Sequence, residues 1–280
     1  MLQSPPPRLA PVCLMNDFTA CPVVSIVIPI YREREFLGQS LDAMVAELKV
    51  HGVSHEIILV EQFSDAETLA ESRVQVDRHP SVRHILLDQP DFGYAMKVGM
   101  LDARGDIVVN FDIDYWDITF VRMCIAMMTE FDIDIVIGSK NSRLSVDKRA
   151  LSRRLISSGY RMVLQSAFGL RVSDTHGIKA WSRSPRLLKL IGTCRFTRDI
   201  FDTELVIRGE RAGLRLLELP VTVAELRPPR TSIVFRVPSA AMNLARLFLV
   251  LANDVPARSS PRGAIAARER TTDLAESDAH

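Results

Sequence analysis

Short runs of β-branched and aromatic residues alternate along the chain with longer segments in which apolar residues recur every three or four positions. The short runs predict buried strands, and the longer segments predict helices with one apolar face. Predicted strands cover 23–28, 56–60, 82–87, 105–111, 133–137, 180–181 and 214–223; predicted helices cover 36–48, a segment after 65, 92–101, 121–128, 151–168, a segment beginning at 200–207, and 240–252. This alternation predicts an α/β fold with right-handed β-α-β units and a mostly parallel sheet covered on both faces.

Two local signals refine these boundaries. Pro29 has no backbone N–H to give to a sheet, so we expect the first strand to end there. Ser64 stands three residues before Glu67, the spacing of a capping box, which predicts that Ser64 caps the second helix.

The fourth predicted strand ends at two acidic residues, Asp112 and Asp114. Ligands of open α/β sheets gather at the carboxyl ends of the strands. Along an extended chain the two carboxylates would point the same way, with Ile113 turned into the core. Two oxygen donors on one side suit Mg²⁺ or Mn²⁺ bound together with the phosphates of a nucleotide. The alternative is a solvated strand-to-helix turn.

A second Asp-x-Asp spacing occurs at Asp132 and Asp134, directly before a strand. It therefore belongs to the opposite edge of the sheet, where we expect no ligand site.

The composition of the chain and the motifs it lacks argue against several classes of protein. The 280 residues carry 35 basic and 34 acidic side chains, a net charge of +1 that argues against a general nucleic-acid binder. The 47% hydrophobic content is enough for a substantial core. No G-x-G-x-x-G follows the first strand and no P-loop occurs, which disfavours dehydrogenases and P-loop NTPases. No Ser-His-Asp or Cys-His spacing is recognisable.

The localisation expected from the sequence is cytoplasmic. The four cysteines show no C-x-x-C spacing, as expected for reduced thiols; they are Cys13, Cys21, Cys124 and Cys194. The proline-rich residues 1–11 lack the apolar stretch of a signal peptide, and no run reaches the roughly 18 apolar residues of a spanning helix. The apolar helix 240–252 could pack against the domain or lie on a membrane, so the alternative is peripheral attachment at the inner membrane face.

Several polar segments allow both a structural and a functional interpretation. The basic run 140–154 is either a solvated helix face or a clamp for phosphate. His176, in a polar loop, either stabilises that loop or takes part in a site. Asp202 and Glu204 fall in the first turn of a helix, where the helix dipole already favours acids.

Taken together, these segments resemble the family-2 glycosyltransferases of the GT-A fold, and among them the dolichol-phosphate or polyprenyl-phosphate mannose and glucose synthases. The resemblance covers about residues 23–232. The matching segments are P-I-Y-R-E-R-E at 29–35, the glycine-containing helix at 93–99, D-I-D at 112–114, G-S-K at 138–140, D-T-H-G-I-K at 174–179, F-D-T-E-L at 201–205 and E-L-P-V at 218–221. Each segment is weak alone, but their order and spacing are jointly specific.

The resemblance implies a role for each matched residue. Asp112 and Asp114 would hold Mg²⁺ or Mn²⁺ on the diphosphate and, with Asp202 and Glu204, form the catalytic set. The nucleotide-sugar, GDP- or UDP-linked, would contact Pro29, Tyr31, Glu33, Val60, Gln62, Lys97, Asp112, Ile113, Lys140, Arg227 and Arg230. A lipid-phosphate acceptor would contact Arg153, Arg154, Asp174 and Lys179. We expect a lead-in over 1–20, a GT-A domain over 21–232, an apolar helix over 233–253 and a disordered tail over 254–280.

Three positions depart from the family pattern. Gln62 stands where the family has an acid, Trp116 where the synthases commonly have a further metal ligand, and Ser232 at the position of a lysine. The expected reaction is an inverting transfer of a sugar to a polyprenyl phosphate. The alternatives are a family-2 transferase with a soluble or glycan hydroxyl acceptor, for which Asp202 or Glu204 would act as base, and a non-catalytic nucleotide-binding relative.

Overall fold

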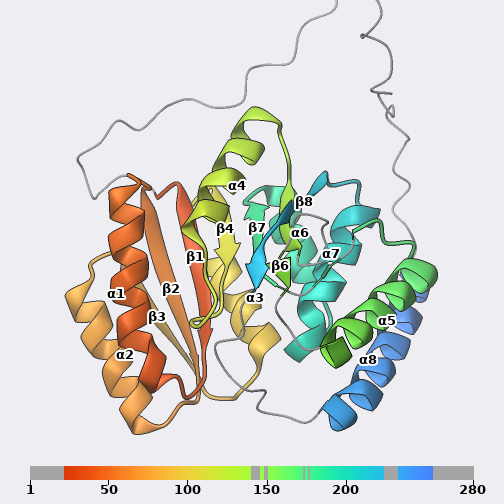
Figure 1. The fold of residues 1–280 in the computed structure, drawn as a ribbon, viewed down its shortest axis with the longest axis horizontal. Coiled ribbons are helices and arrows are strands. Elements are labelled where there is room, and N and C mark those ends of the chain that lie inside the picture. The colour runs from red at the N-terminus through yellow and green to blue at the C-terminus, as the bar shows by residue number, and fades with distance from the viewer. Residues whose placement is uncertain are drawn as a thin grey trace, which may run out of the picture.

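A seven-stranded sheet forms the centre of the molecule (Figure 1). The computed structural model describes residues 22–139, 146–147, 151–172, 174–175, 177–223 and 233–254. The strand order is β3-β2-β1-β4-β7-β5-β8, and only β7 runs antiparallel to its neighbours. The strands are β1 Val24–Ile30, β2 His55–Gln62, β3 Val82–Leu87, β4 Ile107–Asn110, β5 Ile135–Ser139, β7 Lys179–Ser182 and β8 Leu216–Pro220. The predicted α/β class with a mostly parallel sheet is confirmed.

Helices cover both faces of the sheet, because strand residues alternate between the two faces. On one face, Ile26 and Ile28 of β1 share a core with α1 (Arg34–Val50) and α4 (Ile118–Glu130). On the other, Val27 shares a core with the remaining helices apart from α2 (Ala66–Arg78). These are α3 Phe92–Asp102, α5 Leu151–Phe168, α6 Pro185–Thr193, α7 Phe201–Arg211 and α8 Ile233–Asn253.

The structure corrects the prediction at Pro29, which lies inside β1 rather than after it. The amides of Ile107 and Phe111 donate to the carbonyl oxygens of Val23 and Val27, so odd-numbered residues of β1 face β4. Pairing with β4 ends at Val27, while Pro29 still pairs in register with Val60 of β2. The nitrogen of Pro29 therefore points to the side on which β4 has already ended. Because no acceptor of β4 lies there, the missing N–H removes no hydrogen bond from the sheet.

The predicted capping box is also wrong. Asp65, not Ser64, is the N-cap of α2, and its carboxylate accepts a hydrogen bond of 2.9 Å from the amide of Thr68. Asp65 has the extended backbone of an N-cap residue, whereas the Ser64 hydroxyl accepts from the amide of Arg32 instead.

Several other boundaries differ. The predicted strand 214–223 is two strands, β8 and the short β9 (Thr222–Val223), and β9 pairs with β6 (Val146–Asp147) in a separate two-stranded sheet. Helix α6 was not predicted, although Pro185 and its N-cap Ser184 form a recognisable start signal. Helix α8 has the bounds 233–253 given for the C-terminal apolar helix in the predicted domain organisation, and it extends beyond the apolar run 240–252 in the N-terminal direction. No helix in the described part of the chain has the length and apolar character needed to cross a bilayer.

A buried hydrogen bond between neighbouring strands fixes the end of β4. The indole Nε1 of Trp181 donates to Oδ1 of Asn110 at 2.7 Å, and both residues are buried. Asn110 is the last residue of β4, two positions before Asp112. This bond satisfies two polar groups in the core and holds the strand from which the acid pair emerges.

Candidate functional site

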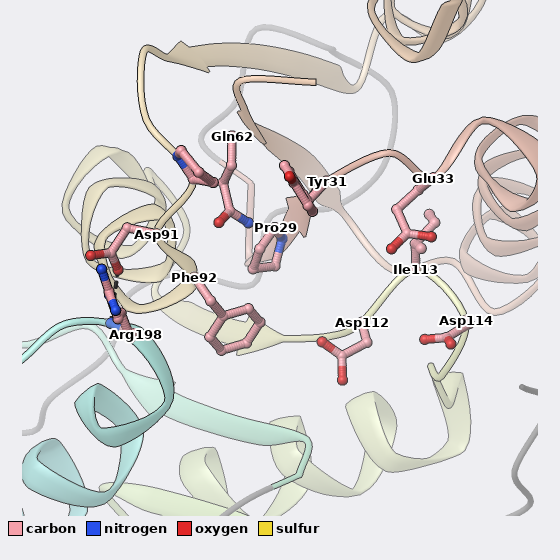
Figure 2. Close-up of a pocket in the computed structure, with 11 residues that line it drawn as sticks. Pro29, Tyr31, Glu33, Gln62, Asp91, Phe92, Asp112, Ile113, Asp114 and Arg198 are labelled. Carbon is pink, nitrogen blue, oxygen red and sulfur yellow. Dashed lines mark hydrogen bonds between the residues drawn. The ribbon is translucent and has the colours of Figure 1, made fainter. Parts of the chain in front are cut away.

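A pocket of about 460 Å³ lies at the carboxyl ends of β1, β2 and β4 (Figure 2). It is at the edge where ligands of open α/β sheets bind. Its lining consists of Pro29, Tyr31, Glu33, Gln62, Pro90, Asp91, Phe92, Asp112, Ile113, Asp114 and Arg198. Seven of these eleven residues were predicted from the sequence, so the pocket brings most of the expected nucleotide contacts together.

Asp112 and Asp114 both line this pocket, but they do so on a turn and not on an extended chain. The amide of Tyr115 donates to the carbonyl oxygen of Asp112, which closes the turn. Ile113 is 3% exposed, and its carbonyl oxygen accepts a hydrogen bond of 2.7 Å from the hydroxyl of Ser40. The turn is thereby anchored to α1, and the prediction that the two acids share one side is confirmed (Figure 2).

The acid pair carries an electrostatic cost. Burial raises the pKa of Asp112 to about 6, and the nearby carboxylates of Asp114, Asp202 and Glu33 add to this effect, while Lys179 opposes it. A carboxylate among other acids is stabilised in its ionised form by any cation that binds between them. Gathering negative charge in a pocket is unfavourable for the protein alone, so this arrangement fits a cation-binding role.

The donor set also indicates which kind of cation fits. The described residues contain no group of three or more His, Cys, Asp or Glu side chains that could hold a metal ion. Two carboxylates leave most positions of an octahedral ion to other oxygens, which is how Mg²⁺ binds with substrate phosphates. The pair therefore fits a hard divalent cation shared with a phosphate ligand, and it does not fit a closed structural metal site.

Next to Asp112 lies a buried ion pair between Lys179 and Asp202. The ammonium Nζ of Lys179 is 2.7 Å from Oδ2 of Asp202 and 2.9 Å from the carbonyl oxygen of Gly177. Lys179 is fully buried at the start of β7. The expected roles were acceptor binding for Lys179 and catalysis for Asp202, and the structure brings the two side chains into contact with each other.

Glu204 lies outside the pocket. It is fully buried and accepts hydrogen bonds from the amides of Arg195 and Phe196 and from Nε of Arg208 at 2.8 to 3.1 Å. Its carboxylate thus holds the loop before α7, which gives it a structural role. The geometry does not support the expected catalytic role of Glu204.

Two predicted nucleotide contacts, Val60 and Lys97, also fall outside the pocket lining. Val60 is fully buried beneath α3, where a Cβ on Gly99 would lie 2.9 Å from its Cγ2 atom. The Nζ atom of Lys97 donates to the carbonyl oxygen of Cys194 at 3.1 Å, at the end of α6. The side chains of both residues therefore make contacts within the fold and not with the pocket.

The remaining predicted residues are only partly described. Asp174 is 7% exposed, and its amide donates to Oε1 of Glu218 at 3.2 Å. Arg153 and Arg154 lie on α5, but the structure does not describe their side chains. Other positions lie outside the described residues: these are Lys140, His176, Arg227, Arg230, Ser232, Cys13 and Cys21.

Four residues of the lining were not assigned to a site from the sequence: Pro90, Asp91, Phe92 and Arg198. Asp91 caps α3, since its Oδ1 atom accepts from the amide of Tyr94 at 2.9 Å, and this role was readable from the helix start at 91–93. Arg198 is more than 100 residues away from Asp91 in the chain, and no local pattern signals its place in the pocket.

Strained backbone surrounds the pocket. Four described residues other than glycine have positive φ angles: Arg32 (56°), Phe63 (48°), Asp132 (56°) and Arg198 (55°). Arg32 and Phe63 directly follow the lining residues Tyr31 and Gln62, and Arg198 is itself in the lining. Left-handed conformations of such residues are unfavourable and cluster at functional sites, so the position of these three residues supports assigning function to this pocket. Asp132 lies apart from them, before β5.

The fold resembles solved glycosyltransferases of the GT-A class. One is the mannosyltransferase PcManGT from Pyrobaculum calidifontis in complex with GDP-Man and Mn²⁺ (TM-score 0.57, 19% identity, 90% of this chain and 70% of that one). Another is mannosyl-3-phosphoglycerate synthase from Rubrobacter xylanophilus (TM-score 0.62, 16% identity, 86% and 78%). Identities this low establish the shared fold alone.

The sequence model described as "Glycosyl transferase family 2" matches residues 25–185. The chain belongs to this family, as the motifs at its strand ends indicated.

Relatives of known name include glycosyltransferase AglD of Haloferax volcanii, 27% identical over 203 residues, which are 71% of this chain and 32% of that protein. The undecaprenyl-phosphate 4-deoxy-4-formamido-L-arabinose transferase of Edwardsiella ictaluri is 26% identical over 214 residues, 75% of this chain and 63% of that protein. The dodecaprenyl-phosphate galacturonate synthase of Rhizobium johnstonii is 27% identical over 131 residues, 46% and 39%. The chain spans less than two thirds of each relative.

Proposed function

We propose that this protein transfers a sugar, with inversion, from a nucleoside-diphosphate sugar to a polyprenyl phosphate, and that it requires Mg²⁺ or Mn²⁺. The observation that carries the proposal is the pair Asp112 and Asp114 in a pocket whose other side offers Tyr31 and Gln62 for a nucleoside. Support comes from the names of the relatives, two of which describe transfer to polyprenyl phosphates. The similar PcManGT was solved with GDP-Man and Mn²⁺.

The chemistry is one in-line displacement. A phosphate oxygen of the acceptor forms a bond to the anomeric carbon on the face opposite the leaving group, and the bond from that carbon to the diphosphate oxygen breaks. The nucleoside diphosphate leaves with the electron pair. When bound, the divalent metal ion acts as a Lewis acid for this leaving group.

The residues of the chain position the reactants around that step. Asp112 and Asp114 bind the cation that accompanies the diphosphate, and Gln62 presents an amide that can both donate to and accept from a base. The charges of Lys179 and Asp202 cancel each other, so their ion pair adds no net charge beside Asp112. The same contact holds the Asp202 side chain in place.

A phosphate acceptor also fits the contact that Asp202 makes with Lys179. An acceptor phosphate is already anionic at neutral pH and needs no strong general base, whereas a hydroxyl acceptor needs a carboxylate to take its proton. Asp202 already accepts a hydrogen bond from the ammonium group of Lys179 at 2.7 Å, so one of the two oxygens that could take a hydroxyl proton is engaged within the protein. This supports the lipid phosphate over a soluble hydroxyl acceptor.

We further propose that α5 and α8 rest on a lipid surface at the inner membrane face. The two helices lie side by side (Figure 1), and the rings of Phe168 and Phe248 meet edge to face at 5.9 Å. The sequences of α5 and α8 contain five arginines and no acidic residue. Among the side chains that the structure describes on these helices, the exposed large apolar ones are Met162, Val163, Met242, Phe248 and Leu249. Basic and apolar residues without acids are the composition of helices that bind anionic bilayers.

The test is transfer of a radiolabelled sugar from GDP- and UDP-linked donors to a short polyprenyl phosphate, with Mn²⁺ or Mg²⁺. We expect labelled product in the organic phase, lost with EDTA and with Asp112→Asn. Labelled product that stays in the aqueous phase with soluble acceptors supports the alternative transferase. No product with any donor, from protein that binds nucleotides, supports a non-catalytic relative.

The lipid surface is tested separately by flotation with vesicles of phosphatidylcholine and phosphatidylglycerol. We expect the wild type to float with the anionic vesicles and the double variant Met242→Ser/Leu249→Ser to remain unbound. Equal behaviour of both proteins contradicts the assigned surface. This assay needs no turnover, so it is independent of the transfer reaction.

A further inference from the structure

Arg198 differs in charge from the rest of the pocket. Of the eleven lining residues that the structure describes, four are acidic and Arg198 alone is basic; the acids are Glu33, Asp91, Asp112 and Asp114. It begins a short 3₁₀ turn, Arg198–Ile200, that leads directly into α7. In Figure 2 the Arg198 side chain lies beside Asp91, across Phe92 from Asp112 and Asp114.

The backbone of Arg198 is held tightly against the start of α3. Its amide donates to Oδ1 of Asp91 at 2.8 Å, the same oxygen that accepts from the amide of Tyr94. The approach is so close that a Cβ atom on Gly93 would lie 2.5 Å from the carbonyl oxygen of Arg198. Asp91 thus joins two segments of the pocket wall through one carboxylate.

The fold does not need an arginine at this position. The contact with Asp91 uses the backbone N–H, which every residue except proline provides. The φ angle of 55° favours glycine or asparagine over a residue with a long side chain. The Arg198 side chain is exposed to the pocket and contributes nothing to the buried core. Its guanidinium group is therefore available to a ligand.

We propose that Arg198 binds a phosphate group of a substrate in this pocket and that Asp91 is the positioning residue that holds it there. A guanidinium group pairs with two phosphate oxygens at once, which gives both charge and direction. The inference rests on the proposed function, since it assumes that an anionic substrate enters a pocket rich in carboxylates. The phosphate belongs either to the nucleoside diphosphate or to the lipid acceptor, and the ligands chosen below separate the two.

The experiment is calorimetric titration of the full chain, with Mn²⁺, using UDP, GDP, uridine, guanosine and farnesyl phosphate. The variants are Arg198→Gln, Arg198→Gly and the control Arg186→Gln, an exposed arginine of α6 outside the pocket lining. Arg198→Gly also relieves the left-handed backbone, so its fold should be at least as stable as the wild type. This variant separates loss of the side chain from loss of structure.

Loss of a charge-assisted hydrogen bond predicts that both Arg198 variants bind the phosphate ligand roughly 10-fold to 100-fold more weakly. Nucleoside binding and the Arg186→Gln control should be unchanged. A selective loss for UDP or GDP assigns Arg198 to the donor, and a selective loss for farnesyl phosphate assigns it to the acceptor. Equal losses for nucleosides and nucleotides, or no loss at all, overturn the inference.

The positioning role of Asp91 is tested by Asp91→Asn, which keeps the shape of the side chain but weakens its hydrogen bonds to both amides. We expect the same selective loss as for Arg198→Gln, and no further loss when the two changes are combined. Additive losses overturn the positioning role. A wild type that binds neither nucleotide contradicts the proposed function itself; the assignment of Arg198 then stands only if pyrophosphate binds the wild type and not Arg198→Gln.

Discussion

Lys179 and Asp202 form an ion pair of 2.7 Å whose charges both act on Asp112 of the pocket, and the lysine is fully buried. The two residues come from β7 and from the first turn of α7, so the contact joins the antiparallel strand of the sheet to the helix on its face. Beside Asp112, an unpaired carboxylate at position 202 would add to the negative charge that already raises the pKa of Asp112. The pair therefore links stability to the electrostatics of the site.

Removing one partner of this ion pair should be strongly destabilising. Lys179→Met leaves Asp202 as a buried charge without its partner, and we expect a loss of about 3–5 kcal/mol in the free energy of unfolding. The double variant Lys179→Met/Asp202→Leu should recover a large part of this loss, because it leaves no buried charge. Urea unfolding of Lys179→Met, Asp202→Leu and the double variant measures the coupling, and additive effects would contradict the ion-pair interpretation.

Gly99 and Gly159 provide a matched pair of alanine substitutions in helices. A Cβ on Gly99 would collide with Val27 and Val60 in the core, so Gly99→Ala should cost about 1–3 kcal/mol through overpacking. A Cβ on Gly159 of α5 meets nothing within 4 Å, so Gly159→Ala should stabilise by about 0.5–1 kcal/mol. Thermal unfolding of both variants gives the comparison, and changes of the same sign would contradict the described packing of α3 on the sheet.

Glu56 should make stability depend on pH in the acid range. Burial alone would raise the pKa of Glu56, but hydrogen bonds from Ser25, Arg83 and Arg104 outweigh it, so the pKa lies below its usual 4.5. The ionised form is thus favoured by folding. Its contribution is present above about pH 4.5 and is lost as the pH falls through the lowered pKa of the folded state.

The measurement is urea unfolding of the wild type and Glu56→Gln between pH 7 and pH 3. We expect the wild type to be more stable by about 1–3 kcal/mol at pH 7, since Glu56 accepts hydrogen bonds from a charged group in a nearly buried position. The difference should shrink below pH 4.5. A difference that stays constant down to pH 3 would show that the carboxylate charge plays no part.

Local sequence patterns predicted helices and strands correctly where the secondary structure of a residue depends on its neighbours in the chain. The buried run of β1 and the periodic apolar positions of α1 and α5 are such cases. Two of the differences arose where a distant strand decides. Pro29 stays in β1 because β4 ends beside it, and β7 is antiparallel because of pairings with β4 and β5 that no local signal reports.

The same distinction holds for the site. Gln62 is the last residue of β2, and Tyr31, Asp112 and Asp114 lie just after the ends of β1 and β4. The carboxyl ends of parallel strands meet at one edge of the sheet, which brings these residues together. Arg198 lies more than 100 residues after Asp91 in the chain. It reaches the pocket because its amide donates to Asp91 and because Gly93 has no side chain to block the approach of its backbone. Conversely, Glu204 has the expected residue type and place in the chain, yet its three hydrogen-bonding partners turn it away from the pocket.

The central claim is that Asp112 and Asp114 bind a divalent cation together with a nucleoside diphosphate. The most direct test is the thermal unfolding of the wild type, Asp112→Asn and Asp114→Asn with UDP or GDP, each with and without Mn²⁺. Ligand at 100 times its dissociation constant stabilises the folded state by about 2.7 kcal/mol. We predict a rise in Tm of roughly 5–10 °C for the wild type that requires both nucleotide and Mn²⁺ and is absent in both variants. A shift that survives in the variants, or that does not depend on the metal, would contradict the account.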